Sequence, residues 1–143
     1  MIEGKTIEKA VALAERGDHT QSLELLRRAL SEARTDADRA EINACCAQSY
    51  EKLGDRANCR EHCERAIAQG YKGAYPYKQL IISYLQLHRF SDALRVCDTA
   101  LEKEGGFDPQ VRNDIRAYAH AWKEIIEYAE ERKLQIERML GKE

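Results

Sequence analysis

Two identical turn signals divide the first half of this chain at a regular interval. The dipeptides Gly17-Asp18 and Gly54-Asp55 stand 37 residues apart, and a third break at His88-Arg89 follows Gly54 by 34 residues. The segments between them are rich in Ala, Leu, Glu, Lys, Arg and Gln, the residues that helices tolerate best. We therefore expect helical hairpins that repeat at a nearly constant period, because a short helix pair buries its apolar face only against a neighbouring pair.

Further breaks near residues 35–38, 70–76 and 105–109 complete the division into helices, and no segment reads as a strand. The predicted helices span 5–16, 19–33, 38–53, 56–69, 75–87, 90–104 and 109–140. Asp108 is suited to cap the last helix and Pro109 to occupy its first position, where a missing amide costs nothing. Pro76 is expected to start the fifth helix in the same way. The sequence therefore predicts an all-α fold.

Composition limits the domain organisation and the partners. With 143 residues, 43% of them hydrophobic, residues 1–143 are expected to form a single domain with a substantial core. The 23 basic and 25 acidic residues are balanced, so neither a nucleic acid nor an anionic membrane is an expected partner. No apolar run approaches the ~20 residues of a membrane span. Five cysteines are too few, and odd in number, for a disulfide scaffold, which favours a reducing, cytoplasmic setting.

Matching residues recur at the same places in three successive segments. The third segment reads Tyr77-x2-Leu80-Ile81-x2-Tyr84, followed by Ala93, Cys97, Ala100 and Leu101. The second has Asn43, Cys46, Ala47, Tyr50, Cys59, Cys63, Ala66 and Ile67 at these places, and the first has Thr6, Lys9, Ala10, Leu13, Ser22, Leu26, Ala29 and Leu30. In each segment the fifth of these residues follows the fourth by nine positions: Ser22 follows Leu13, Cys59 follows Tyr50 and Ala93 follows Tyr84.

In this pattern the chain resembles the tetratricopeptide repeat (TPR) family, with repeats at about 3–36, 40–73 and 74–107. It departs from the family in lacking the terminal proline of each repeat and in carrying three extra residues between the first two repeats. The resemblance implies a right-handed TPR superhelix of three antiparallel helix pairs, followed by a long C-terminal capping helix over 109–140.

TPR proteins generally bind partners on a concave surface lined by the first helix of each pair. The resemblance places the following residues there: Ile7, Val11, Ala14, Glu41, Ala44, Cys45, Gln48, Glu51, Tyr75, Lys78, Gln79, Ile82 and Leu85. The peptide-binding set chosen from them is Ile7, Val11, Ala44, Cys45, Gln48, Tyr75, Lys78, Ile82 and Leu85. Ile82 and Leu85 exceed what the core needs, because Tyr77, Leu80, Ile81, Tyr84 and Leu87 are expected to fill it.

The expected function is a non-catalytic protein-interaction module or chaperone-like adaptor that binds an apolar peptide or helix in this groove. Alternatively, the last helix folds back and fills the groove. Family members that grip the C-terminal carboxylate of heat-shock chaperones use fixed cationic and amide donors. The corresponding places here hold Ile7, Val11, Cys45, Tyr75 and Gln79, which offer no charge, so that subclass is excluded.

The last predicted helix carries an apolar stripe expected to cover the open end of the stack. Its members are Val111, Ile115, Tyr118, Trp122, Ile125 and Ala129. The remainder, residues 123–140, mixes apolar residues with charges. It is either a solvated tail, a contact for homo-oligomerisation or an attachment to a longer protein.

Catalytic and metal chemistry are the weaker interpretations. Cys59-x2-His62-Cys63 has the spacing of metal ligands on one helix, and Cys45 or Cys46 could complete a zinc site. However, four of the five cysteines stand at core places, where a thiol serves as a small apolar group. His19 and His88 lie at turns, His62 on a mostly polar face and His120 on the last helix, so no catalytic set is indicated. No enzyme activity, metal or cofactor is expected, and RNA binding is left open.

Overall fold

The computed structural model describes residues 4–141, with side chains from Thr6 onward, and within this range it contains only helices and loops. The all-α prediction is confirmed, and every helix ends within two residues of its predicted limits. The helices are α1 (Gly4–Glu15), α2 (His19–Glu32), α3 (Asp36–Lys52), α4 (Arg56–Ala68), α5 (Tyr75–Gln86), α6 (Phe90–Glu102), the 3-10 turn η1 (Glu104–Gly106) and α7 (Pro109–Met139).

Side-chain caps fix the start of three helices, each satisfying one amide that the helix itself leaves unpaired. Pro109 occupies the first position of α7, as predicted. Pro76 is in the second position of α5, because Tyr75 already begins that helix. The capping oxygens of Thr35, Asp55 and Asp108 accept hydrogen bonds from the amides of Asp38, Asn58 and Val111 at 3.1, 3.2 and 3.0 Å.

The three predicted hairpin turns share one backbone geometry. Gly17, Gly54 and His88 all have positive φ, at 87°, 78° and 55°. Such a residue commonly ends a helix because it allows the next amide to bond a carbonyl of the last turn. The bonds run from Asp18 N to Leu13 O at 2.8 Å, from Asp55 N to Tyr50 O at 2.9 Å, and from Arg89 N to Tyr84 O at 2.9 Å.

Burial also recurs at the predicted intervals. Leu13, Tyr50 and Tyr84 supply the carbonyls bonded at the three turns. Nine positions after each of them stands a buried residue, namely Ser22, Cys59 and Ala93. Lys9 is the exception to the predicted core pattern, because it is exposed where the later segments bury an apolar side chain. The other buried positions in phase are Ala10, Ala47 and Ile81; Leu26, Cys63 and Cys97; and Ala29, Ala66 and Ala100.

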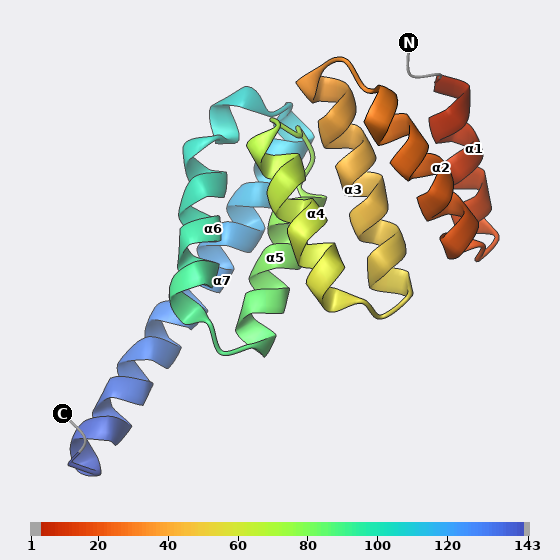
Figure 1. Ribbon diagram of the computed structural model, residues 1–143. Helices are drawn as coiled ribbons and strands as arrows, with labels where there is room; N and C mark the ends of the chain where they lie inside the picture. Colours follow the sequence, from red (N-terminus) through yellow and green to blue (C-terminus); the bar gives the residue numbers. More distant parts are fainter. Residues whose placement is uncertain (1–3, 142–143) are drawn as a thin grey trace. The chain divides into compact units, whose positions relative to one another are not determined.

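The chain divides into two compact units, one ending at Gln79 and one beginning at Leu80. In the first unit α1 packs on α2, α2 on α3 and α3 on α4 as successive antiparallel helices (Figure 1). One cluster of its core contains Ala10, Leu23, Leu26, Ala29, Ile42 and Cys46.

In the second unit α6 packs antiparallel to α7, which is more than twice its length. Ion pairs join Arg116 to Glu104 and Lys123 to Asp98, both at 2.9 Å. The distal part of α7 continues past the start of α6 (Figure 1).

The buried face of α7 differs from the predicted stripe. Ile115 is buried as expected, but its buried companions are Ala119 and Ile126, whereas Tyr118 and Ile125 are 41% and 54% exposed. The prediction of a single stripe over Tyr118 and Ile125 was therefore wrong. The predicted stripe averages 3.6 residues per step and so keeps to one side of the helix, but at 100° per residue the buried Ile115, Ala119 and Ile126 centre about 60° around the helix from it.

One further core prediction was wrong. Leu87 is 46% exposed. It follows the last residue of α5 and precedes the left-handed His88, so the turn carries its side chain away from the packed face.

Among the described helices, none combines the length and the apolar character that crossing a bilayer requires.

Candidate functional site

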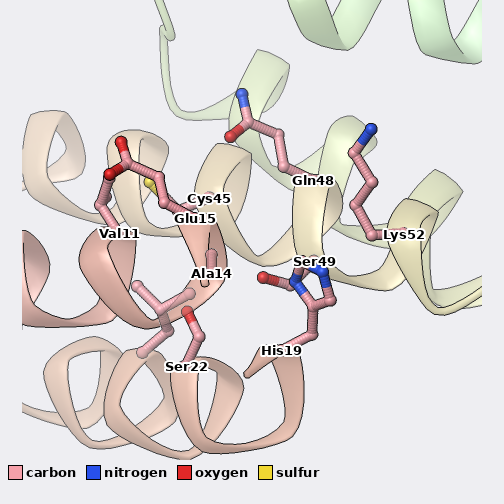
Figure 2. Close-up of a pocket in the computed structure, with 10 residues that line it drawn as sticks. Val11, Ala14, Glu15, His19, Ser22, Cys45, Gln48, Ser49 and Lys52 are labelled. Carbon is pink, nitrogen blue, oxygen red and sulfur yellow. The ribbon is translucent and has the colours of Figure 1, made fainter. Parts of the chain in front are cut away.

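A pocket of about 270 Å³ lies within the first unit, between α1, the start of α2 and α3. Figure 2 shows the side chains that surround it. Four of them belong to the predicted concave surface, and they come from two helices a repeat apart in the sequence: Val11 and Ala14 from α1, and Cys45 and Gln48 from α3. The remaining lining residues are Glu15, His19, Ser22, Leu26, Ser49 and Lys52.

The helical period explains why these residues share the pocket. On α3 the spacings of three, four and seven from Cys45 place Gln48, Ser49 and Lys52 on the same side of the helix. Leu26, which is 1% exposed, forms an apolar base, and Val11, at 39%, offers an accessible apolar wall. The pocket therefore combines an apolar interior with amide, ammonium and carboxylate groups at its edge.

His19 is the unusual member of the lining. Its Nδ1 atom is buried and, within the described part of the chain, has no hydrogen-bond partner. A buried polar atom without a partner typically destabilises a fold by about 1–3 kcal/mol. A polar group of a ligand or a water molecule in the pocket could supply the missing hydrogen bond.

Sequence reasoning missed the polar side of this pocket for two different reasons. Ser49 and Lys52 follow from the helical spacing that begins at Cys45, a signal available in the sequence. His19 does not, because it begins α2 and reaches the pocket only through the packing of α2 against α1 and α3.

The other predicted binding residues of the first unit do not line this pocket. Ile7 is half-buried against the core, and Ala44 is 2% exposed and offers no accessible surface. The Tyr75 hydroxyl donates to Glu51 Oε1 at 2.6 Å, and burial together with this bond raises the Tyr75 pKa. Lys78 is half-buried.

Ile82 and Leu85 belong to the second unit, where each is half-buried. These two side chains, which were predicted to exceed what the core needs, are therefore only partly exposed to solvent. The binding role assigned to them stays a prediction.

The cysteines are all free thiols, and four of the five are buried. Burial raises the pKa of Cys45 to about 11, that of Cys46 to about 12 and that of Cys97 to about 11. These thiols stay protonated near neutral pH, so they are poor nucleophiles. Between Cys59 and Cys63 a hydrogen bond lowers the pKa of Cys59 and raises that of Cys63.

His62 is half-buried and belongs to a chain of polar side chains. Its Nδ1 is 2.8 Å from Asn43 Oδ1, and its ring stacks on Tyr50 with centroids 5.3 Å apart. The side-chain amides of Asn43 and Gln69 are 2.7 Å apart and continue the chain. Burial lowers the His62 pKa. Among the residues described, no three His, Cys, Asp or Glu side chains are grouped as metal ligands.

The second unit has an apolar hollow of its own. It measures about 620 Å³ and lies between the beginning of α6 and the distal half of α7. His88 and Phe90 line one side, and Ile125, Tyr128, Ala129, Arg132, Lys133, Ile136 and Glu137 line the other.

Comparison with protein-family models and with curated proteins finds no match for this chain. The geometry of the two hollows is therefore the basis for assigning a function.

Proposed function

We propose that this protein is a non-catalytic, TPR-like interaction module, an adaptor or chaperone-like protein that binds an apolar peptide or helix on the inner wall formed by α1 and α3. The observation that carries the proposal is the first-unit pocket, which gathers Val11, Ala14, Cys45 and Gln48 from two helices. Each of these residues stands where the TPR resemblance expects a partner.

The repeated turns support the TPR-like part of the proposal. Turn geometry of the same kind at Gly17, Gly54 and His88 makes three successive helix pairs locally equivalent. The buried positions recur in phase with those turns. A right-handed superhelix of three such pairs, with α7 as its cap, is the arrangement that we propose for the whole chain.

The pocket suits one apolar side chain held beside a peptide backbone. Burying a Leu-sized side chain contributes about 1.5–3 kcal/mol, too little for stable capture alone. In the described part of the chain Gln48 and Lys52 make no hydrogen bond or ion pair, so their side chains are available to backbone carbonyls of a ligand. We therefore expect an extended segment with several anchors, of which this pocket holds one.

Peptide selection tests the proposal directly. A randomised peptide library displayed on phage is selected against the full chain, and the enriched peptides are synthesised and titrated by calorimetry. We expect enrichment of apolar residues, and a loss of at least tenfold in affinity for Val11→Glu, because a carboxylate would enter the apolar wall.

Ala12→Glu is the matched control, because Ala12 is an exposed neighbour on α1 that does not line the pocket. It should bind the peptides with unchanged affinity. Equal losses in the two variants, or no enrichment of apolar peptides, would contradict the proposal.

The free thiols support a cytoplasmic location. All five cysteines are unpaired, and a reducing compartment is the setting in which unpaired thiols persist. The location is tested by expressing a fluorescent fusion of the full chain and imaging it.

A further inference from the structure

The distal half of α7 presents a second apolar face. Ile125, Ile136 and Met139 are 54%, 48% and 85% exposed, although each is large and hydrophobic. Together with neighbours at steps of three and four they form what we call the distal stripe: Trp122, Ile125, Ala129, Arg132, Ile136 and Met139. A run of such steps has the 3.5-residue period typical of helices that pair with another helix.

The distal stripe is separate from the face that packs in the unit. At 100° per residue its centre lies about 100° around α7 from the buried Ala119 and Ile126. The acidic residues of the distal half lie on other sides of the helix, because at 100° per residue each is at least about 100° from the centre of the stripe. These carboxylates belong to Glu124, Glu127, Glu130, Glu131 and Glu137.

The stripe borders the hollow at the start of α6. The ion pairs of Glu104 with Arg116 and of Asp98 with Lys123 show that the two helices run past each other almost residue for residue. Phe90, the first residue of α6, therefore lies level with the middle of the distal stripe. There the second-unit hollow opens between Phe90 and Ala129. A second helix laid along the stripe would fill this hollow.

We propose that a second copy of this chain occupies the stripe, with its own α7 antiparallel to the first. In the antiparallel register that the spacing defines, Ile125 lies opposite Ile136 of the second copy and Trp122 lies opposite Met139. Ala129 then lies opposite Arg132, so that the one small residue of the stripe faces its one long polar residue. The stripe is thus complementary to itself in size, the property that a two-fold interface requires.

Charge argues against a lipid surface as the occupant. Residues 123–139 carry five acidic and four basic side chains. An amphipathic helix that binds anionic lipid has a polar face rich in Lys and Arg, which this helix lacks. This self-association does not depend on the peptide groove, so either proposal survives failure of the other.

The oligomeric state of the full chain tests the proposal. Light scattering after size exclusion, at tens of micromolar protein, should give twice the 16.4 kDa chain mass. Ile136→Glu should halve that mass without loss of helical circular dichroism, because the side chain is exposed. Leu134→Glu is the matched control, since Leu134 is equally exposed, at 49%, but points away from the stripe. It should remain dimeric.

Three outcomes would overturn the proposal. They are a monomeric parent chain, a dimer unaffected by Ile136→Glu, and equal dissociation by both variants. Flotation with vesicles of phosphatidylcholine and phosphatidylserine identifies the competing occupant, because binding by a monomeric chain would assign the stripe to a membrane instead.

Cross-linking tests the register. In a Cys45→Ser background, Ile125→Cys and Ile136→Cys chains are mixed under mild oxidation. The antiparallel register predicts mixed disulfide dimers well in excess of either self-linked species. Predominant Ile125→Cys self-linkage would mean a parallel pair and would overturn the arrangement.

Discussion

The pocket of the first unit and the distal stripe of the second are both apolar, but they differ in shape and in their relation to the core. The pocket is small and concave, and its base, Leu26, is also a core residue. The stripe is long and periodic, it borders a wider hollow, and most of its side chains are exposed. A concave site selects a ligand by the volume of one side chain, whereas a periodic stripe selects by register along a helix. Only the first is tied to the stability of its unit.

The largest expected contrast comes from truncating one residue of each surface. Leu26→Ala should lower the free energy of unfolding by about 2–5 kcal/mol, because it leaves a cavity in a packed core. Ile136→Ala should change it by less than about 0.5 kcal/mol, as exposed positions usually do, once any dimer is accounted for. Urea denaturation of both variants at several protein concentrations measures the difference. Equal losses would mean that the stripe is part of the folded core.

The polar chain around Asn43 in the first unit is expected to have the next largest effect. Asn43→Ala removes the buried amide that faces both His62 and Gln69, and it leaves these two half-buried side chains without that partner. The expected loss is about 1–3 kcal/mol. Urea unfolding checks the loss against Gln48→Ala, an exposed α3 substitution expected to be nearly neutral. A neutral Asn43→Ala would show that the chain contributes no stability.

The turns allow a finer comparison between the units. Gly54→Ala should destabilise by about 1–2 kcal/mol from backbone strain alone, because a Cβ at this glycine would meet no atom within 4 Å. His88→Gly relieves similar strain, but glycine adds backbone entropy to the unfolded state, so its net effect should stay within about 0.5 kcal/mol. Thermal unfolding of the two variants distinguishes these effects. A large loss for His88→Gly would mean that its side chain stabilises the turn.

The smallest expected effect is a pH dependence confined to the first unit. Burial lowers the His62 pKa below its ordinary 6.5, so the unfolded chain takes up a proton at a higher pH than the folded chain does. The stability that His62 contributes is therefore complete above pH 6.5 and declines as the pH falls toward the folded pKa. Urea titrations of wild type and His62→Gln across this range should diverge below neutrality. Parallel curves would contradict the assignment.

Local features could be predicted from the sequence, whereas features created by tertiary contact could not. Helix limits followed from Gly17, Gly54 and the Asp108-Pro109 start because capping and turn chemistry act within a few residues. The face of α7 that packs could not be inferred, since Ile125 and Ile126 are equally apolar neighbours. In the structure Ile126 is the one that is buried, and Arg116 and Lys123 on the same helix form ion pairs with Glu104 and Asp98.

The candidate site shows the same division. Val11, Ala14, Cys45 and Gln48 were predicted because a repeat pattern assigns inner and outer faces to each helix. The half-buried state of Ile7 and the burial of Ala44 depend on how closely neighbouring helices approach, which the pattern does not specify. His19 entered the pocket through helix packing, and its residue type gave no indication of that position.

The buried thiols provide a way to measure local opening of the fold. Cys46, Cys59 and Cys63 are shielded within one unit and Cys97 within the other. An alkylating reagent can therefore modify them only when the surrounding helices open. Mass spectrometry of single-cysteine variants would time that opening separately for each half of the chain. Oxidants, by the same reasoning, would damage the denatured chain long before they affect the native one.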